Sequence, residues 1–302
     1  MRRKYMKKNS ESKTREWINT FLWAGLIAII FRSFLLEPFN IPSGSMIPTL
    51  QVGDHLFVTK WSYGYSRNSF PFGSWNIWQG RFFASEPARG DVVVFRKPGS
   101  NIDYVKRLIG LPGDTVQMVA GRLYINGAVA QRENPRPFIM ANLSRSLRSA
   151  GYSRVGDDGR IMVIKGNQIF IDNQPADFNY TIEYRPSSVC QRNSYECMVI
   201  DATEYDEILP GGVRHSIVEI SDTEQFDNTR LFTVPENHYF FMGDNRDMSM
   251  DSRAENIGFV PRDNLLGRAQ VLWYSHNYYA MLPFVWTWGN KMRWERFGMG
   301  IK

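Results

Sequence analysis

Two serines flank one glycine in the stretch EPFNIPSGSMIPTLQVGD, residues 37 to 54, which directly follows a long apolar run. A serine hydroxyl becomes a nucleophile when it is exposed, when a base takes its proton and when donors stabilise the oxyanion that forms. Pro42, Gly44 and Pro48 predict an irregular loop, in which a backbone N–H and a neighbouring hydroxyl can point at one spot. Ser45 is therefore a candidate nucleophile, although most Ser-Gly-Ser tripeptides are ordinary turns.

A candidate base lies in DYVKRLIGLPGD, residues 103 to 114. On an alternating strand Tyr104 and Lys106 share one face, and Val105 lies on the other. A lysine on a strand is usually a solvated edge residue. It becomes a base only if burial lowers its pKa from about 10.4 toward neutrality, because an ammonium group cannot accept the serine proton. The apolar neighbours in this strand favour such burial, so Lys106 is the candidate base.

A third polar stretch is FFMGDNRDMSMDSR, residues 240 to 253. Its density of Asp, Asn, Ser and Arg after an apolar run predicts a hydrogen-bonded loop. A calcium loop would have a similar composition, but the spacing does not match an EF-hand, because no Glu stands at the required position. A metal site is the less favoured interpretation, and we expect no metal and no cofactor.

Other bases and nucleophile motifs compete with this pair. A Ser-His-Asp triad would need one of four histidines, but each lies in a strand-like or aromatic context and is interpreted as a packing or surface residue. A Ser-x-x-Lys acyl-enzyme, as in penicillin-binding proteins, is disfavoured because Ser45 is followed by Met, Ile and Pro. The four histidines are His55, His215, His238 and His276.

The apolar run WINTFLWAGLIAIIFRSFLL, residues 17 to 36, predicts a transmembrane helix, because at about 1.5 Å per residue it spans roughly the 30 Å hydrocarbon layer. Residues 1 to 16 hold seven Lys/Arg and two Glu, so +5 of the net charge of +6 lies there. By the positive-inside rule the tail is cytoplasmic and the later residues lie outside. Arg32 is tolerated if it snorkels to the outer interface.

Two other interpretations of this run are a buried core helix and a cleavable signal peptide. The second is disfavoured because no A-x-A-like site follows the run, so we expect the anchor to be retained. Because the charge is concentrated in the tail, the remaining chain is close to neutral and a nucleic-acid partner is not expected.

The whole chain has 302 residues, 43% of them hydrophobic, which is enough to bury a core. Beyond the anchor its pattern of short β-rich runs predicts strands. Asn126-Gly127, Asp158-Gly159 and Gly211-Gly212 are hairpin-type pairs. Residues 130 to 155 give no assignable pattern. The predicted fold class is mainly β, an antiparallel β-sheet ectodomain behind a single N-terminal transmembrane helix.

Cys190 and Cys197 lie close together in CQRNSYEC. In an exported domain an even count at short spacing predicts a disulfide, whereas a zinc site would need two further ligands nearby. Two unpaired thiols are the remaining alternative.

Taken in this order behind an N-terminal anchor, the three stretches resemble the boxes of the bacterial type I signal peptidases, also called leader peptidases. PSGSMIPTL is similar to the family's nucleophile box, YVKRLIGLPGD to its lysine box and GDNRDMSMDSR to its third box, and the terminal GRAQVLWY also fits. The resemblance covers about residues 17 to 118 and 232 to 275. It implies a membrane-bound serine endopeptidase that removes signal peptides from exported preproteins with a Ser-Lys dyad, cleaving after small side chains.

The resemblance also implies a role for each matching residue. Ser45 would be the nucleophile and Lys106 the general base. Ser43 would contribute its hydroxyl to the oxyanion hole beside the Ser45 backbone N–H, and Ser249 would orient the lysine.

Further positions would support the site or contact the substrate. Asp251 and Arg253 fall on family positions that brace the site as an ion pair. The positions that match the walls of the shallow substrate pockets are Phe39, Ile41, Pro42, Met46, Leu50, Tyr104 and Val105.

The expected organisation follows from these matches. Residues 1 to 16 form a cytoplasmic tail, 17 to 36 the anchor, 37 to 118 with 232 to 302 the catalytic β core, and 119 to 231 a β-rich inserted subdomain. The expected location is the bacterial inner membrane, single-pass, with the catalytic domain on the periplasmic or outer side. The expected partners are signal-peptide-bearing preproteins and the lipid bilayer.

Three features leave alternatives open. The best-described Gram-negative members have two anchors, whereas this chain shows one apolar span. Met248 and Met250 stand where small or amide residues are more usual in the third box. The aromatic and basic C-terminal stretch FVWTWGNKMRWERFGMGIK suits either a membrane interface or packing on the β domain. A membrane-anchored β domain that binds a partner without catalysis remains the competing function, and it would not require Lys106.

Overall fold

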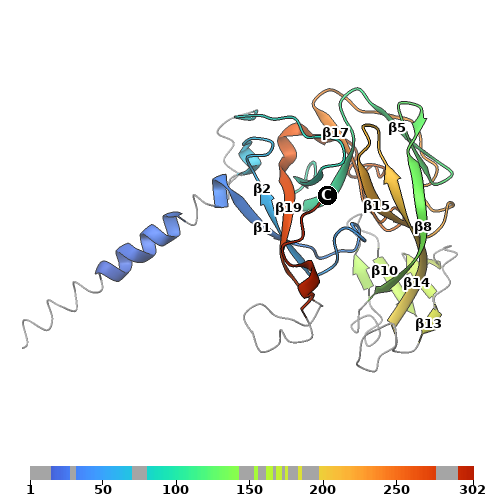
Figure 1. Ribbon diagram of the computed structural model, residues 1–302, viewed down its shortest axis with the longest axis horizontal. Coiled ribbons are helices and arrows are strands. Elements are labelled where there is room, and N and C mark those ends of the chain that lie inside the picture. Colours follow the sequence, from blue (N-terminus) through green and yellow to red (C-terminus); the bar gives the residue numbers. More distant parts are fainter. Residues whose placement is uncertain are drawn as a thin grey trace, which may run out of the picture.

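The computed structural model describes residues 15–27, 32–69, 80–142, 153–155, 161–165, 168–171, 174–175, 183–185, 197–276 and 292–302. Among them, one helix, Arg15–Phe34, is long and apolar enough to cross a membrane, and it projects from the β-rich body (Figure 1). The prediction of mainly antiparallel sheets behind one N-terminal apolar helix is confirmed. The apolar run nevertheless outlasts the helix, because Leu36 already begins strand β1 (Leu36–Asn40).

The end of the helix is fastened to the β-rich body by polar contacts. Glu37 forms ion pairs with Arg32 at 2.8 Å and with Lys60 at 2.9 Å, and the Lys60 side chain is almost fully buried. The Tyr65 hydroxyl donates to the Phe34 carbonyl at 2.6 Å. The charge of Arg32 is therefore compensated on the side of the β domain.

A seven-stranded antiparallel sheet carries the three boxes of the sequence. It joins strands from the first third of the chain to strands near its end, which lie side by side around β19 (Figure 1). Its order is β1, β2 (Asp54–Thr59), β19 (Leu265–Ser275), β3 (Val92–Arg96), β4 (Asp103–Gly110), β17 (His238–Met242) and β18 (Val260–Pro261).

Three smaller sheets come mostly from the middle of the chain. The first contains β16 (Phe232–Thr233), β5 (Thr115–Val119), β6 (Arg122–Ile125) and β7 (Ala128–Val129). The second contains β13 (Glu183–Arg185), β14 (Cys197–Ile208) and β15 (Arg214–Glu219), with β8 (Gln131–Asn142) on β14. The third contains β12 (Gln174–Pro175), β11 (Gln168–Ile171), β10 (Ile161–Lys165) and β9 (Ser153–Val155). Short 3-10 turns are η1 (Arg67–Ser69), η3 (Arg262–Asn264) and η6 (Trp294–Arg296).

The hairpin pairs behave as their residue types require. Asn126 and Gly127, which connect β6 to β7, both have positive φ, at 52° and 77°. Such a turn matches the twist of the flanking strands, and asparagine and glycine adopt it at little cost. Gly211 and Gly212 connect β14 to β15 in the same region of φ. Asp158-Gly159 lies outside the described residues.

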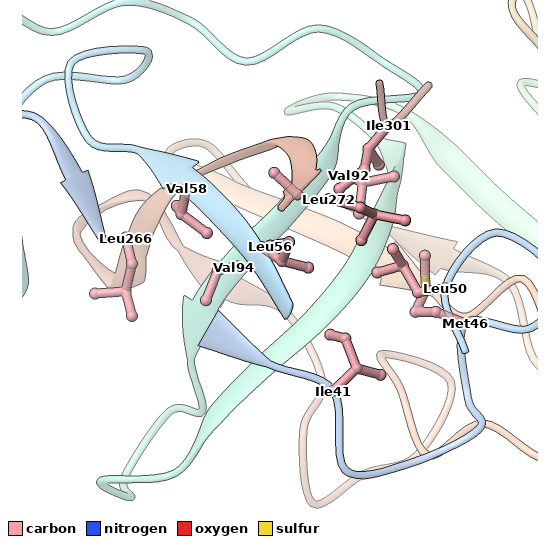
Figure 2. Packing of buried hydrophobic residues seen from close by; sticks show 11 residues of the cluster. Ile41, Met46, Leu50, Leu56, Val58, Val92, Val94, Leu266, Leu272 and Ile301 are labelled. Atoms are coloured by element: carbon pink, nitrogen blue, oxygen red, sulfur yellow. The ribbon is translucent and has the colours of Figure 1, made fainter. Parts of the chain in front are cut away.

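A hydrophobic cluster between β2, β3 and β19 supports the loop between β1 and β2, residues 41–53, here called the serine loop. Met46 and Leu50 are 1% and 0% exposed, and Figure 2 shows them lying on this loop at one end of the cluster. Burial of each such side chain contributes about 1.5–3 kcal/mol. The loop is therefore held by its own apolar residues rather than left free above the sheet.

Candidate active site

Hydrogen bonds at both ends fix the serine loop. The Ile41 N–H donates to the Asp54 carbonyl at 2.8 Å, and the Leu50 N–H to the Met46 carbonyl, also at 2.8 Å. The buried Asp54 carboxylate accepts from Ser275 at 2.6 Å and pairs with Arg296 at 2.6 Å. With its ends closed and its apolar residues buried, the loop leaves the half-buried segment around Ser45 at the surface.

The side chain of Lys106 reaches Ser45 from strand β4 of the seven-stranded sheet. Lys106 lies on β4, opposite Val93 of β3, and is 2% exposed. Its Nζ is hydrogen-bonded to Ser45 Oγ, across 61 residues of sequence, and lies 5.9 Å from the centre of the Tyr104 ring. Ser43 Oγ lies 3.5 Å from Ser45 Oγ. The structure thus brings together the hydroxyl and the amine that the first two stretches supplied.

The loop of the third stretch, residues 243–253, packs directly against the serine loop; we call it the third-box loop. The Asn245 backbone N–H donates to the Ser45 carbonyl, and its side-chain amide donates to the Gly44 carbonyl, both at 3.1 Å. A Cβ on Gly243 would lie 2.2 Å from Ser249 Oγ and 2.4 Å from the Ser45 carbonyl oxygen. Only a glycine at position 243 lets the two loops approach this closely.

Ser249 itself is 3% exposed and lies across Gly243 from Ser45. Its Oγ has no hydrogen-bond partner among the described residues, so the expected bond to Lys106 is not part of this arrangement. The orienting role of Ser249 stays a prediction.

Asp251 and Arg253 form a buried, two-point ion pair within this loop. Arg253 Nε and Nη2 lie 2.9 and 2.8 Å from the two Asp251 oxygens, and the Gly243 N–H donates to Asp251 at 3.0 Å. Burial opposes ionisation of Asp251, but Arg253 and these hydrogen bonds, together with Lys106 when it is protonated, hold the pKa of its carboxyl below the usual value. Asp251 is therefore an anion within electrostatic reach of Lys106.

Sequence reasoning missed a second set of buried charges beneath the site. Arg107, the residue after Lys106, binds Asp244 at 2.8 and 2.7 Å, and Thr49 of the serine loop donates to the same carboxylate at 2.5 Å. Arg246 binds Glu207 of β14, with Nη1 3.0 Å from Oε1. Arginines in the second and third boxes were the available signal, and the partners of Arg107 and Arg246 lie 137 and 39 residues away.

The four histidines contact aromatic, backbone and carboxylate groups. The rings of His55 and His276 lie 5.4 Å apart beside Trp273 and Tyr274. His238 Nδ1 contacts the Glu236 carbonyl at 2.9 Å.

His215 is buried between the two missed ion pairs, 3.5 Å from Glu207 and 3.9 Å from Asp244. Burial, with the Arg107 charge adding to it, lowers its pKa to about 4. The ring is therefore neutral near neutral pH, and this predicts a specific acid sensitivity.

Because the folded-state pKa of His215 lies below the unfolded value of about 6.5, the unfolded chain binds more protons between these two pH values. The effect of His215 on the free energy of unfolding is therefore most favourable above pH 6.5. Protonation of the unfolded chain lowers this free energy as the pH falls from 6.5 to 4, by about 3 kcal/mol at most. We expect His215→Gln to flatten the decline of unfolding free energy over this range, measured by denaturant unfolding. The partly exposed His238→Gln serves as the control, and an unchanged slope in His215→Gln would refute the assignment.

The predicted pocket residues occupy three kinds of position. Ile41, Met46 and Leu50 are buried in the cluster under the serine loop, and Tyr104 is buried on β4. Phe39 and Val105 pack on that cluster while partly exposed, and Pro42 is exposed.

The predicted disulfide lies outside the described residues. Cys190 is not described, and for Cys197 only the backbone at the start of β14 is.

Comparison with known proteins gives matches of three kinds. The family model described as signal peptidase, peptidase S26, matches residues 14–274. A protein named signal peptidase I from Rickettsia prowazekii is 34% identical over 275 residues, covering 88% of this chain and 83% of that protein. Its namesake from Rickettsia conorii is 35% identical over 272 residues, covering 89% and 83%. A solved structure of a signal peptidase I from Enterococcus faecalis is 26% identical and covers 61% of this chain and 97% of that one, with a TM-score of 0.26.

Proposed function

The chain belongs to the signal peptidase family, peptidase S26, and is a serine endopeptidase that cleaves signal peptides from secreted preproteins; we propose that Ser45 and Lys106 perform the reaction. One observation carries the proposal: the Nζ of a lysine that is 2% exposed is hydrogen-bonded to a serine hydroxyl held at the surface by a braced loop. Nucleophile and base in hydrogen-bond contact, with a further group orienting the base, are the recurring signature of covalent hydrolysis.

In the first step Ser45 Oγ attacks the scissile carbonyl carbon while its proton passes to Lys106 Nζ. The amine accepts this proton only in its neutral form, and burial disfavours the charged ammonium form. A tetrahedral intermediate results, with negative charge on the former carbonyl oxygen. Ser43 Oγ–H, 3.5 Å from Ser45 Oγ, and the Ser45 backbone N–H are the proposed donors to this oxyanion.

In the second step the intermediate collapses, the C–N bond breaks and the Lys106 ammonium returns its proton to the leaving amine. The signal peptide is then held as an ester on Ser45. Neutral Lys106 next takes a proton from water, whose oxygen attacks the ester carbonyl, and the second collapse releases the signal peptide and restores the Ser45 hydroxyl.

The third-box loop positions the serine loop and, in our proposal, Lys106. Its Asn245 holds the carbonyl groups of Ser45 and Gly44, which fixes the backbone N–H of the proposed oxyanion hole. We assign Ser249 to orienting Lys106 once substrate closes the site, because catalytic hydrogen bonds often tighten only in the complex. Asp251 and Arg253, which belong to this loop, brace it from within by their ion pair.

The proposed preference is for small side chains before the scissile bond. Phe39, Val105 and the loop residue Pro42 retain exposed surface, whereas the loop residues Met46 and Leu50 are buried in the hydrophobic cluster beneath the loop. Because these bulky side chains lie close to Ser45 in the proposed site, they leave room only for a small side chain of the substrate.

The membrane placement rests on the N-terminal apolar helix, which makes the enzyme membrane-anchored. We propose that it is single-pass in a bacterial inner membrane, with the catalytic domain outside, because the basic charge precedes the helix. Protease added to intact spheroplasts should digest the β domain and spare the N-terminal tail, as followed by antibodies to tags at the two ends. Protection of the β domain until lysis would reverse the topology.

The direct test of the function is incubation of the purified full-length protein with a preprotein that carries a signal peptide, followed by mass-spectrometric mapping of the cut. We expect one cut after a small residue at the end of the signal peptide. Cleavage at unrelated sites, or none, would contradict the proposal.

A further inference from the structure

A group of buried carboxylates lies beside the third-box loop, apart from the Ser45–Lys106 contact. Glu219 ends β15, Asp227 lies in the loop that follows β15, and Asp247 belongs to the third-box loop. One carboxylate oxygen from each of the three residues lies within 4.8 Å of the others. Glu219 is 3% exposed and Asp227 is 0% exposed, so two of the three are out of contact with solvent.

Two of these carboxylates have one oxygen engaged and one without a partner. Asp247 Oδ2 accepts the backbone N–H groups of Ile220 and Ser221, at 2.6 and 3.2 Å, and Asp227 Oδ2 accepts that of Glu224. The second oxygen, Oδ1, of both aspartates is buried and has no hydrogen-bond donor among the described residues. A buried carboxylate oxygen without a donor is costly, and it needs either a proton or a cation.

The neighbouring arginines are already paired, one with the third carboxylate of the group and one with a carboxylate outside it, and neither donates to Asp227 or Asp247 Oδ1. Arg132 is paired with Glu219, and Arg253 is paired at two points with Asp251. Asp227 and Asp247 therefore keep a net negative charge between them. Burial, with the Asp247 charge adding to it, raises the pKa of Asp227 to about 6, and burial raises that of Glu219 to about 7 despite Arg132.

We propose that Glu219, Asp227 and Asp247 bind a divalent cation of the calcium type, which joins the loop after β15 to the third-box loop. Calcium is coordinated by oxygen ligands at about 2.3–2.6 Å, so oxygens up to about 4.8 Å apart can share one ion. Backbone amides orient Asp227 and Asp247 so that each keeps one oxygen for the ion. The cation supplies the positive charge that the two orphaned oxygens lack and fastens the loop that carries Ser249.

The test uses full-length protein in detergent at pH 8, freed of metal by a chelator and then titrated with Ca²⁺. Thermal unfolding should show a rise in Tm of about 5–10 °C at a hundredfold excess over the dissociation constant. Isothermal titration calorimetry should give one ion per chain.

The Asp227→Asn variant distinguishes a cation-binding site from a carboxylate cluster that has only a structural role. The neutral amide removes repulsion with Asp247, so the metal-free variant should be at least as stable as the metal-free wild type, yet its response to Ca²⁺ should disappear. Asp263→Asn, which removes one carboxylate elsewhere, should respond as the wild type does.

Three outcomes would overturn the proposal. The first is a wild-type Tm that Ca²⁺ leaves unchanged. The second is an equal Ca²⁺ response in Asp227→Asn, which would place the ion elsewhere. The third is stabilisation between pH 8 and pH 6 without any response to Ca²⁺, which would assign the orphaned oxygens to a shared proton. None of these measurements depends on peptidase activity.

Discussion

Ser45→Ala and Lys106→Ala should each lower kcat/KM for preprotein cleavage by at least about 10³-fold, and the double variant should be scarcely worse than either one. The two groups act as a unit, so removing one leaves the other without a function, and their effects do not add. Cleavage of a preprotein by purified variants, quantified over several hours, measures all three losses.

Lys106→Met is the matched control for packing. Lys106 is 2% exposed, so truncation to alanine opens a cavity, whereas methionine fills most of the volume without an amine. Equal thermal stability of wild type and Lys106→Met, with cleavage lost, would separate chemistry from folding. Either lysine variant retaining most of its activity would remove the dyad and favour a non-catalytic or histidine-based interpretation.

The second large effect is expected from the Asp251–Arg253 pair. Removing Arg253 takes away the main charge that compensates Asp251, so ionised Asp251 then depends on the charge of Lys106 and favours the ammonium form of the lysine. Arg253→Met should therefore move the alkaline rise of kcat/KM to higher pH by about one unit or more, and lower activity at pH 8 by about 10-fold or more. Asp251→Asn should move the rise the opposite way.

Folding has to be monitored in the same experiment, because removing one partner of a buried pair costs about 3–5 kcal/mol. The measurement is a pH profile of kcat/KM well below the Tm of each variant. Arg268→Met, in a more exposed ion pair with Asp91, is the control. Equal losses at every pH, with no displacement of the profile, would reduce Asp251 and Arg253 to the bracing role that the family resemblance implies.

Local patterns predicted the elements that local chemistry controls. The apolar run gave the helix, and Asn126-Gly127 gave a hairpin because both residues adopt positive φ cheaply. The end of the helix was misplaced because apolar residues serve a membrane helix and a strand equally well, and Leu36 belongs to β1. The long strand β8 was not recognised because its prolines interrupt the pattern. They are tolerated because, among the described strands, β8 pairs only with β14, as an edge strand can.

The residues of the candidate site also fall into those that a local sequence pattern predicts and those that it does not. Ser45 and Lys106 stood out because their segments have an unusual composition, and the structure joins them by a hydrogen bond. The Arg107–Asp244 pair and the Glu219, Asp227 and Asp247 cluster could not be predicted, because their members come from distant segments and only strand pairing brings them together. The spacing argument against a calcium loop considered one continuous segment, whereas the carboxylates converge from three.

The most direct test of the dyad is the pH dependence of kcat/KM for the wild type and for Lys106→Arg. A neutral lysine as base predicts that wild-type activity rises with pH as one proton is lost and then levels off. The arginine variant should be inactive throughout, because a guanidinium stays protonated and cannot accept the Ser45 proton. An arginine variant with a similar alkaline rise would show that Lys106 is not the base.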